Sequence, residues 1–137
     1  MQLNRSTDYA IQMLVYLAKN GQTLSSTKLA ASLGISHRYL LQISSKLRAV
    51  GFIVAVHGPS GGLKIFKNPE EISLYDVILS MEGVVQTGKI CGLPSDELER
   101  EMVTLEIAYQ RLNILLAKEL REVTLSDIIG KGYVSEG

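Results

Sequence analysis

STKLAASLGISHRYLLQISSKLRAV, residues 26–50, is the stretch that decides the fold of this chain. Its apolar residues recur at steps of three and four in two short runs, which is the spacing of two helices that bury one shared face. Gly34 separates the runs, where a tight turn needs a residue free to adopt a positive φ, and Ser36 follows as an N-cap. The pattern predicts a helix-turn-helix, whose second helix lies in the major groove of DNA. The shared face consists of Leu29, Ala30, Leu33, Ile35, Leu40 and Ile43.

The second helix of the pair is expected to extend to about Val50, with Leu40, Ile43, Leu47 and Val50 facing inward. The side chains between these positions then face outward, and most of them carry hydrogen-bond donors. Arginine can hold guanine through two hydrogen bonds, and glutamine can hold adenine in the same way. An ordinary solvated helix surface is the other interpretation. The predicted DNA contacts are Ser36, His37, Arg38, Tyr39, Gln42 and Lys46, with Lys28 from the preceding helix.

A β-hairpin is predicted directly after these helices. Residues 52–57 and 63–66 are rich in strand-forming side chains, and the glycine-rich residues 58–62 join them. A hairpin in this place is a wing, which can contact the minor groove or the DNA backbone. The wing residues expected to contact DNA are His57, Gly58, Ser60, Gly61 and Lys64.

The tip of this hairpin also matches the G-x-S-x-G pattern of a catalytic serine. That motif needs a turn from a strand into a helix and, in the usual order of its fold, a later histidine. Here a strand follows, and no histidine lies beyond His57. The chain offers no acid–base pair and no spacing of metal ligands either, so we expect a protein that is not an enzyme and holds no metal.

A first helix is predicted from an N-cap at Ser6 to a stop at Asn20–Gly21, backing the helix-turn-helix. Arg5 and Thr7 lie at its start and are candidate phosphate contacts, because helix N-termini favour anions. Tyr39 is open to two interpretations, packing inward or placing its hydroxyl against a phosphate.

The net charge of zero hides a division between the two halves of the chain. Residues 1–68 carry eight lysines and arginines against one acidic residue, a net charge of +7. Residues 69–137 carry six basic and thirteen acidic residues, a net charge of −7. Chance segregation on a soluble surface is one explanation, but a basic half facing a polyanion is favoured.

The 137 residues are enough for one compact domain, or for a small domain with a dimerisation arm. We expect no signal peptide and no membrane span, because the longest uncharged run near the N-terminus is too short. A single cysteine excludes an intrachain disulfide framework and fits a reducing cytoplasm, so a cytoplasmic protein is expected.

The second half of the chain predicts a dimerisation helix. Ser73-x-x-Asp76 has the spacing of a helix cap, and Thr124-x-x-Asp127 repeats it before a short last helix. Between them a long helix is expected from about residue 95, with apolar residues at steps of four and three. One small domain cannot easily cover that stripe, so we expect a twofold homodimer, although packing within the chain remains an alternative. The predicted interface is Leu98, Met102, Leu105, Tyr109, Leu112 and Leu116.

The predicted fold is therefore mainly α-helical with a small β-wing. A winged helix-turn-helix domain spans residues 1–82, and a linker spans residues 83–94. The dimerisation helix and the short last helix span residues 95–129, and a tail spans residues 130–137.

The order of these elements resembles the Rrf-two (Rrf2) family of winged helix-turn-helix regulators. The likeness covers most of the chain. It implies a dimer with crossed long helices that represses or activates transcription at palindromic operators. The segments that carry the resemblance are DYAIQMLVYLA at 8–18, LGISHRYLLQ at 33–42, KLRAVGFI at 46–53, HGPSGGL at 57–63, NPEEISLYDVI at 68–78 and VTLSDI at 123–128.

Two departures from the family pattern matter. His57 stands where the family often has arginine before the wing, which weakens the charge there. Cluster-binding members carry three cysteines near the dimerisation helix, whereas this chain has only Cys91. No cofactor is therefore expected, since an iron–sulfur cluster would need non-cysteine ligands and two subunits.

Cys91 lies in the predicted linker and is a candidate redox sensor, or an idle residue. A small-molecule effector or a partner protein acting on the linker is the remaining option. The favoured function is a sequence-specific DNA-binding transcription regulator, a repressor acting as a homodimer. The alternative is a winged-helix protein-interaction or redox-sensor module without its own operator.

Overall fold

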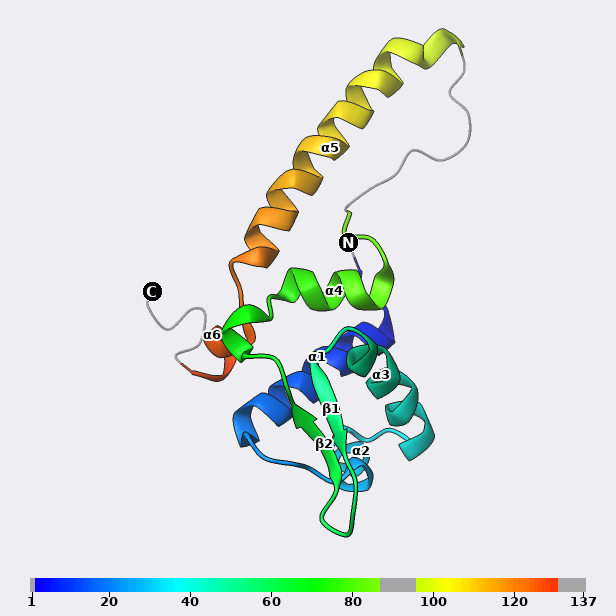
Figure 1. The fold of residues 1–137 in the computed structure, drawn as a ribbon. Helices are drawn as coiled ribbons and strands as arrows, with labels where there is room; N and C mark the ends of the chain where they lie inside the picture. Colours follow the sequence, from blue (N-terminus) through cyan, green and yellow to red (C-terminus); the bar gives the residue numbers. More distant parts are fainter. Residues whose placement is uncertain (1, 87–95, 131–137) are drawn as a thin grey trace.

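A helical body carries one β-hairpin and one long projecting helix (Figure 1). This computed structural model describes residues 2–86 and 96–130. The predicted fold class, mainly helical with a two-stranded wing, is confirmed. The elements are α1 (Arg5–Asn20), α2 (Ser26–Leu33), α3 (His37–Ala49), β1 (Ile53–Val56), β2 (Gly62–Ile65), the 3-10 helix η1 (Pro69–Glu71), α4 (Leu74–Glu82), the 3-10 helix η2 (Asp96–Leu98), α5 (Glu99–Arg121) and α6 (Leu125–Ile129).

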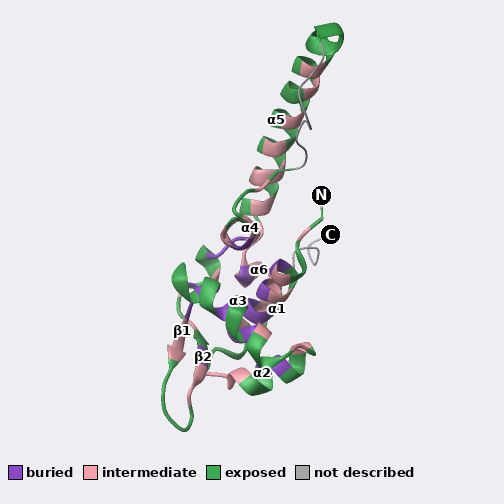
Figure 2. Ribbon diagram, turned by 90° about the vertical axis from the view of Figure 1, so that its right-hand side faces the viewer, coloured by how far each residue is buried: buried purple, intermediate pink, exposed green. Residues whose placement is uncertain are grey.

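The core forms around α1, which lies between the helix-turn-helix and the C-terminal elements (Figure 2). Its inward face is fully buried, as is the inward face of α3 at Leu40 and Leu47. The expectation that Val50 also faces inward is wrong, because its side chain is 46% exposed. Helix α3 ends at Ala49 and the chain reverses at Gly51 (φ +81°), so Val50 falls outside the helical register.

The ends of the helices follow local capping chemistry. The Ser36 hydroxyl accepts a hydrogen bond from the Tyr39 backbone N–H at 3.1 Å, so the predicted N-cap of α3 is confirmed. Gly34 takes the predicted positive φ, +70°. Helix α1 begins earlier than expected, because Asn4 and not Ser6 is its N-cap. The Asn4 backbone N–H donates to the Glu82 carboxylate at 3.2 Å, which joins the start of α1 to the end of α4.

The wing is fixed to the body at its base. Strands β1 and β2 pair antiparallel, and Leu63 also pairs with Leu24 ahead of α2. Gly62 makes this contact possible, because a Cβ there would lie 2.0 Å from the Leu24 carbonyl oxygen. The hairpin is thereby held beside α3.

Two capping boxes join the C-terminal elements to the body. The Ser73–Asp76 box starts α4 and the Thr124–Asp127 box starts α6, which confirms both predicted caps. Ser73 and Thr124 also pair as an antiparallel bridge, so the two helix starts are held together. These contacts attach the end of α5 to the domain that carries α3.

Helix α5 has no buried residue in the described chain. At 3.6 residues per turn its apolar side chains fall on two faces. One is the predicted stripe, where Met102, Leu105, Tyr109 and Leu116 are half-buried. The other face carries Val103, Ile107 and Ile114, all more than half exposed. Among the described helices, none combines the length and apolar character needed to cross a membrane.

Candidate nucleic-acid interface

The outer face of α3 is a shallow, donor-rich surface. Arg38, Gln42 and Lys46 all project from it and are exposed. Leu41, 41% exposed, lies among them and is the one large apolar side chain on this face. The structure thus brings together the predicted α3 residues that point outward, and it adds two neighbours. The complete surface is His37, Arg38, Leu41, Gln42, Ser45 and Lys46.

His37 connects the starts of α2 and α3. Its Nε2 atom lies 2.7 Å from the Ser26 hydroxyl, in hydrogen-bonding contact. Ser26 and His37 are the first residues of their helices, so this bond fixes the first turns of α2 and α3 relative to one another. Arg38 follows His37 directly and is held at the first turn of α3, the part of such a helix that contacts base edges. Lys28 is exposed on the first turn of α2.

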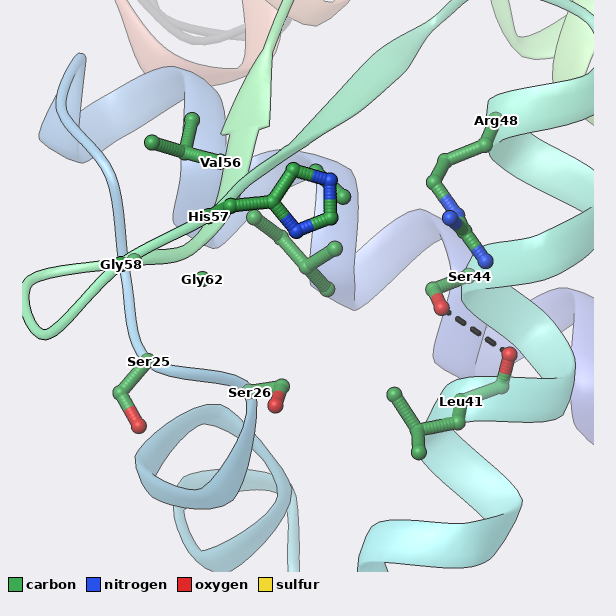
Figure 3. A pocket seen from close by; sticks show the side chains of 12 residues that line it. Ser25, Ser26, Leu41, Ser44, Arg48, Val56, His57, Gly58 and Gly62 are labelled. Carbon is green, nitrogen blue, oxygen red and sulfur yellow. Dashed lines mark hydrogen bonds between the residues drawn. The ribbon is translucent and has the colours of Figure 1, made fainter.

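A groove runs between α3 and the wing (Figure 3). The Arg48 side chain enters it from α3, and His57 enters it from the end of β1. Ser25 and Ser26 line its other side, from the start of α2. The predicted wing residues Gly58 and Gly61 are in its lining, whereas Ser60 and Lys64 are exposed outside it.

Arg48, Ser26 and Leu41 are site residues that sequence analysis missed. Leu41, Ser44 and Arg48 lie at steps of three and four, so helical spacing could have placed them on one flank of α3. The wing faces this flank because Leu63 pairs with Leu24. The sequence of α3 alone does not indicate that pairing.

Of the two candidate phosphate contacts at the start of α1, only Arg5 is accessible to solvent. The Arg5 guanidinium is exposed and lies 5.8 Å from the centre of the Tyr9 ring. Its interaction with the Tyr9 side chain, by hydrogen bonding first and charge second, raises the pKa of Arg5, which therefore keeps its charge. Thr7 is removed from the candidate set, because its side chain is fully buried and cannot contact a ligand in solvent. Tyr39 is half-buried, and its ring packs nearly perpendicular to that of Tyr9, with 5.9 Å between the ring centroids.

A comparison with protein families explains this arrangement. The family model described as an iron-dependent transcriptional regulator, Rrf2, matches residues 3–131. The chain belongs to the Rrf2 family. This Rrf2 protein therefore has the fold of a DNA-binding transcription regulator, and the predicted resemblance is confirmed.

Solved structures share the fold of this Rrf2 chain along nearly its whole length. Bacillus subtilis CymR (YrzC), the global cysteine regulator, has a TM-score of 0.76 at 23% identity, covering 94% of this chain and 96% of that one. The oxidized form of Staphylococcus aureus CymR has a TM-score of 0.76 at 26% identity, covering 95% and 97%. T. potens IscR has a TM-score of 0.74 at 22% identity, covering 94% and 86%.

A curated relative is similar over part of the sequence. Protein aau3 of Rhizobium meliloti (strain 1021) is 37% identical over 79 residues, which are 57% of this chain. The match spans about half, 51%, of that relative.

The family description raises the question of an iron–sulfur cluster, for which one subunit supplies a single thiol. Cys91 is the only thiol in the sequence, and it lies outside the described residues. In residues 2–86 and 96–130, no three His, Cys, Asp or Glu side chains converge as a metal-binding group. Both histidines of the chain, His37 and His57, are at the candidate interface. A three-thiolate iron–sulfur site cannot be assembled from one subunit.

Proposed function

We propose that this Rrf2 protein is a sequence-specific transcription regulator that acts as a homodimer, as a repressor, on palindromic operators. The observation that carries the proposal is the continuous surface formed by the outer face of α3 and the groove beside it. Arg38, Lys46 and Arg48 supply three cations to this surface. Asp8 on α1 is the one acidic residue among residues 1–68. No carboxylate on α3 or the wing therefore repels the DNA phosphates.

Each part of the surface suits a different part of a duplex. The first turns of α3 enter the major groove, where Arg38 and Gln42 have the donors to distinguish bases. Leu41 is placed to contact the methyl group of thymine. With α3 in the major groove and the wing tip at the minor groove, the phosphate strand between them passes along the groove that Arg48 and His57 line.

The homodimer is supported by α5. A helix of 23 residues with no buried side chain leaves its apolar stripe only partly covered within the described chain. A second copy of the same stripe is complementary to it under twofold symmetry. Two copies of α3 related by that axis require two half-sites related in the same way, which is a palindrome. A dimer seated on a promoter excludes polymerase, which is the basis for proposing repression.

The test of this function is the salt dependence of duplex binding. We expect affinity for a promoter fragment from upstream of its own gene to fall by about 10³-fold between about 50 and 200 mM salt, because lysine and arginine displace condensed counterions. Fluorescence anisotropy with a labelled duplex measures the affinity at each salt concentration. A scrambled duplex of the same composition is the control. Absence of binding to either duplex, or equal binding to both, would contradict sequence-specific regulation and favour the protein-interaction module instead.

We also propose that this regulator works without an iron–sulfur cluster, since one cysteine per chain gives too few thiolates. Protein purified without oxygen is expected to be colourless and to bind DNA. Its visible absorbance spectrum checks this, with iron and sulfide analysis as a second measurement. A visible cluster band that is lost together with DNA binding on exposure to air would refute the cofactor-free regulator.

A further inference from the structure

A second cavity lies on the side of α3 away from the wing. It is formed where the first turn of α1, the middle of α3 and the end of α4 meet, and its volume is about 290 Å³. Its floor is apolar, because Ile43 is 2% exposed and Met81 is 8% exposed. Its rim is polar and consists of Ser6, Tyr39, Gln42 and Lys46. An apolar floor with a few convergent polar groups is the usual character of a small-molecule site.

The charges around this cavity favour an anion with a small apolar body. Among the described residues that line the cavity, Lys46 is the only charged one, and none carries a carboxylate. On α4, the Glu82 carboxylate next to Met81 in the chain accepts the Asn4 backbone N–H at 3.2 Å. One ammonium group above an apolar floor can bind a ligand with one carboxylate, whereas a phosphate group is usually bound by several cations.

Two of the rim residues face both the cavity and the DNA-binding surface. Gln42 and Lys46 line this cavity and also line the outer face of α3. A carboxylate that holds the Lys46 ammonium at the cavity withdraws it from DNA phosphate. The carboxylate also adds a negative charge beside the path of the duplex. Binding of the ligand therefore lowers the affinity for DNA, and by linkage binding of DNA lowers the affinity for the ligand by the same factor.

We propose that the cavity between α1, α3 and α4 is an effector site for a small organic acid, with its carboxylate on Lys46 and its apolar body on Ile43 and Met81. The consequence for DNA rests on the proposed function, whereas the site itself does not. Occupancy lowers operator affinity, so the organic acid acts as an inducer.

The first experiment uses the free full-length chain and no DNA. Benzoate is the probe, with benzamide as its neutral analogue and benzylamine as its cationic analogue. Two-dimensional amide NMR is expected to show benzoate shifting the signals of Ser6, Ile43 and Met81. A probe of this size binds with a dissociation constant on the order of 10 mM or tighter. Benzamide should bind about tenfold more weakly and benzylamine not at all, because Lys46 selects the anion.

Two variants separate a built site from general surface binding. Ser6→Phe fills the cavity from its rim and should abolish the benzoate shifts, with a urea melt to confirm that it folds. Lys46→Met removes the ammonium and should weaken benzoate about tenfold while leaving benzamide unchanged. Lys19→Met, an exposed lysine at the end of α1, is the matched control and should bind benzoate like the parent protein. Equal binding of benzoate and benzamide, or benzoate shifts that persist in Ser6→Phe, would overturn the site.

The second experiment adds the promoter duplex. Saturating benzoate should weaken operator binding by the parent protein and leave Ser6→Phe unaffected. If the chain binds no duplex at all, the proposed function is wrong, but the NMR experiment still shows whether the cavity binds benzoate. If benzoate binds and operator affinity stays the same, the site stands and its role as an inducer site is overturned.

Discussion

The double variant Leu105→Asp, Leu112→Asp is expected to be a monomer that has lost DNA binding. Both side chains lie on the apolar stripe of α5, and Leu112 is 49% exposed in the single chain. Two carboxylates placed in a helix–helix contact must be desolvated without partners, which is strongly unfavourable. Loss of the second half-site contact should reduce operator affinity by about 10²–10⁴-fold.

Sedimentation velocity at micromolar concentration distinguishes one chain from two, and anisotropy gives the affinity. The matched control is Ile107→Asp, Ile114→Asp, which places the same two charges on the opposite face of α5. That face has fewer apolar residues and is interrupted by Gln110, whereas the stripe continues without a break. We therefore expect the control to remain a dimer. If the control became a monomer while the Leu105→Asp, Leu112→Asp variant stayed a dimer, the interface would lie on the other face.

Replacing Arg38 with alanine is expected to cost about 1–3 kcal/mol of binding free energy per half-site, or about 5- to 150-fold. Arg38 is exposed on the first turn of α3, beside the bond that joins His37 to Ser26. If its guanidinium contacts a base, the loss is specific to one position of the operator. The variant should bind duplexes altered at that position as well as it binds the parent operator.

Lys19→Ala is the control for this measurement, because it removes a cation from the end of α1 without touching α3. Its affinity should match the parent protein. An Arg38→Ala protein that loses affinity uniformly for every sequence would show a phosphate contact and not a base contact. Unchanged affinity would show that α3 is not the reading helix.

Local chemistry made much of this fold predictable. The Ser36 cap, the Gly34 turn and the Ser73 and Thr124 capping boxes each depend on residues within four positions of one another. Helical periodicity also identified the outward-facing donors of α3. Where it failed, at Val50, the helix had ended and the periodicity no longer applied.

The remaining features depend on contacts between distant segments. The sequence places Thr7 at an exposed helix start, yet its side chain is fully buried, and the end of α4 is joined to this start by the Asn4–Glu82 hydrogen bond. The groove that Arg48 lines exists because the hairpin is held against Leu24. The cavity over Ile43 needs α4 to lie beside α3, and no pattern within α3 indicates that neighbour.

The central claim is that two copies of α3 read two related half-sites. Selection of bound duplexes from a random pool, followed by sequencing, tests it most directly. The account predicts an inverted repeat whose half-sites lie about one helical turn apart or a multiple of it, as twofold symmetry requires. Enrichment of a single asymmetric motif, or of no motif at all at low salt, would contradict it.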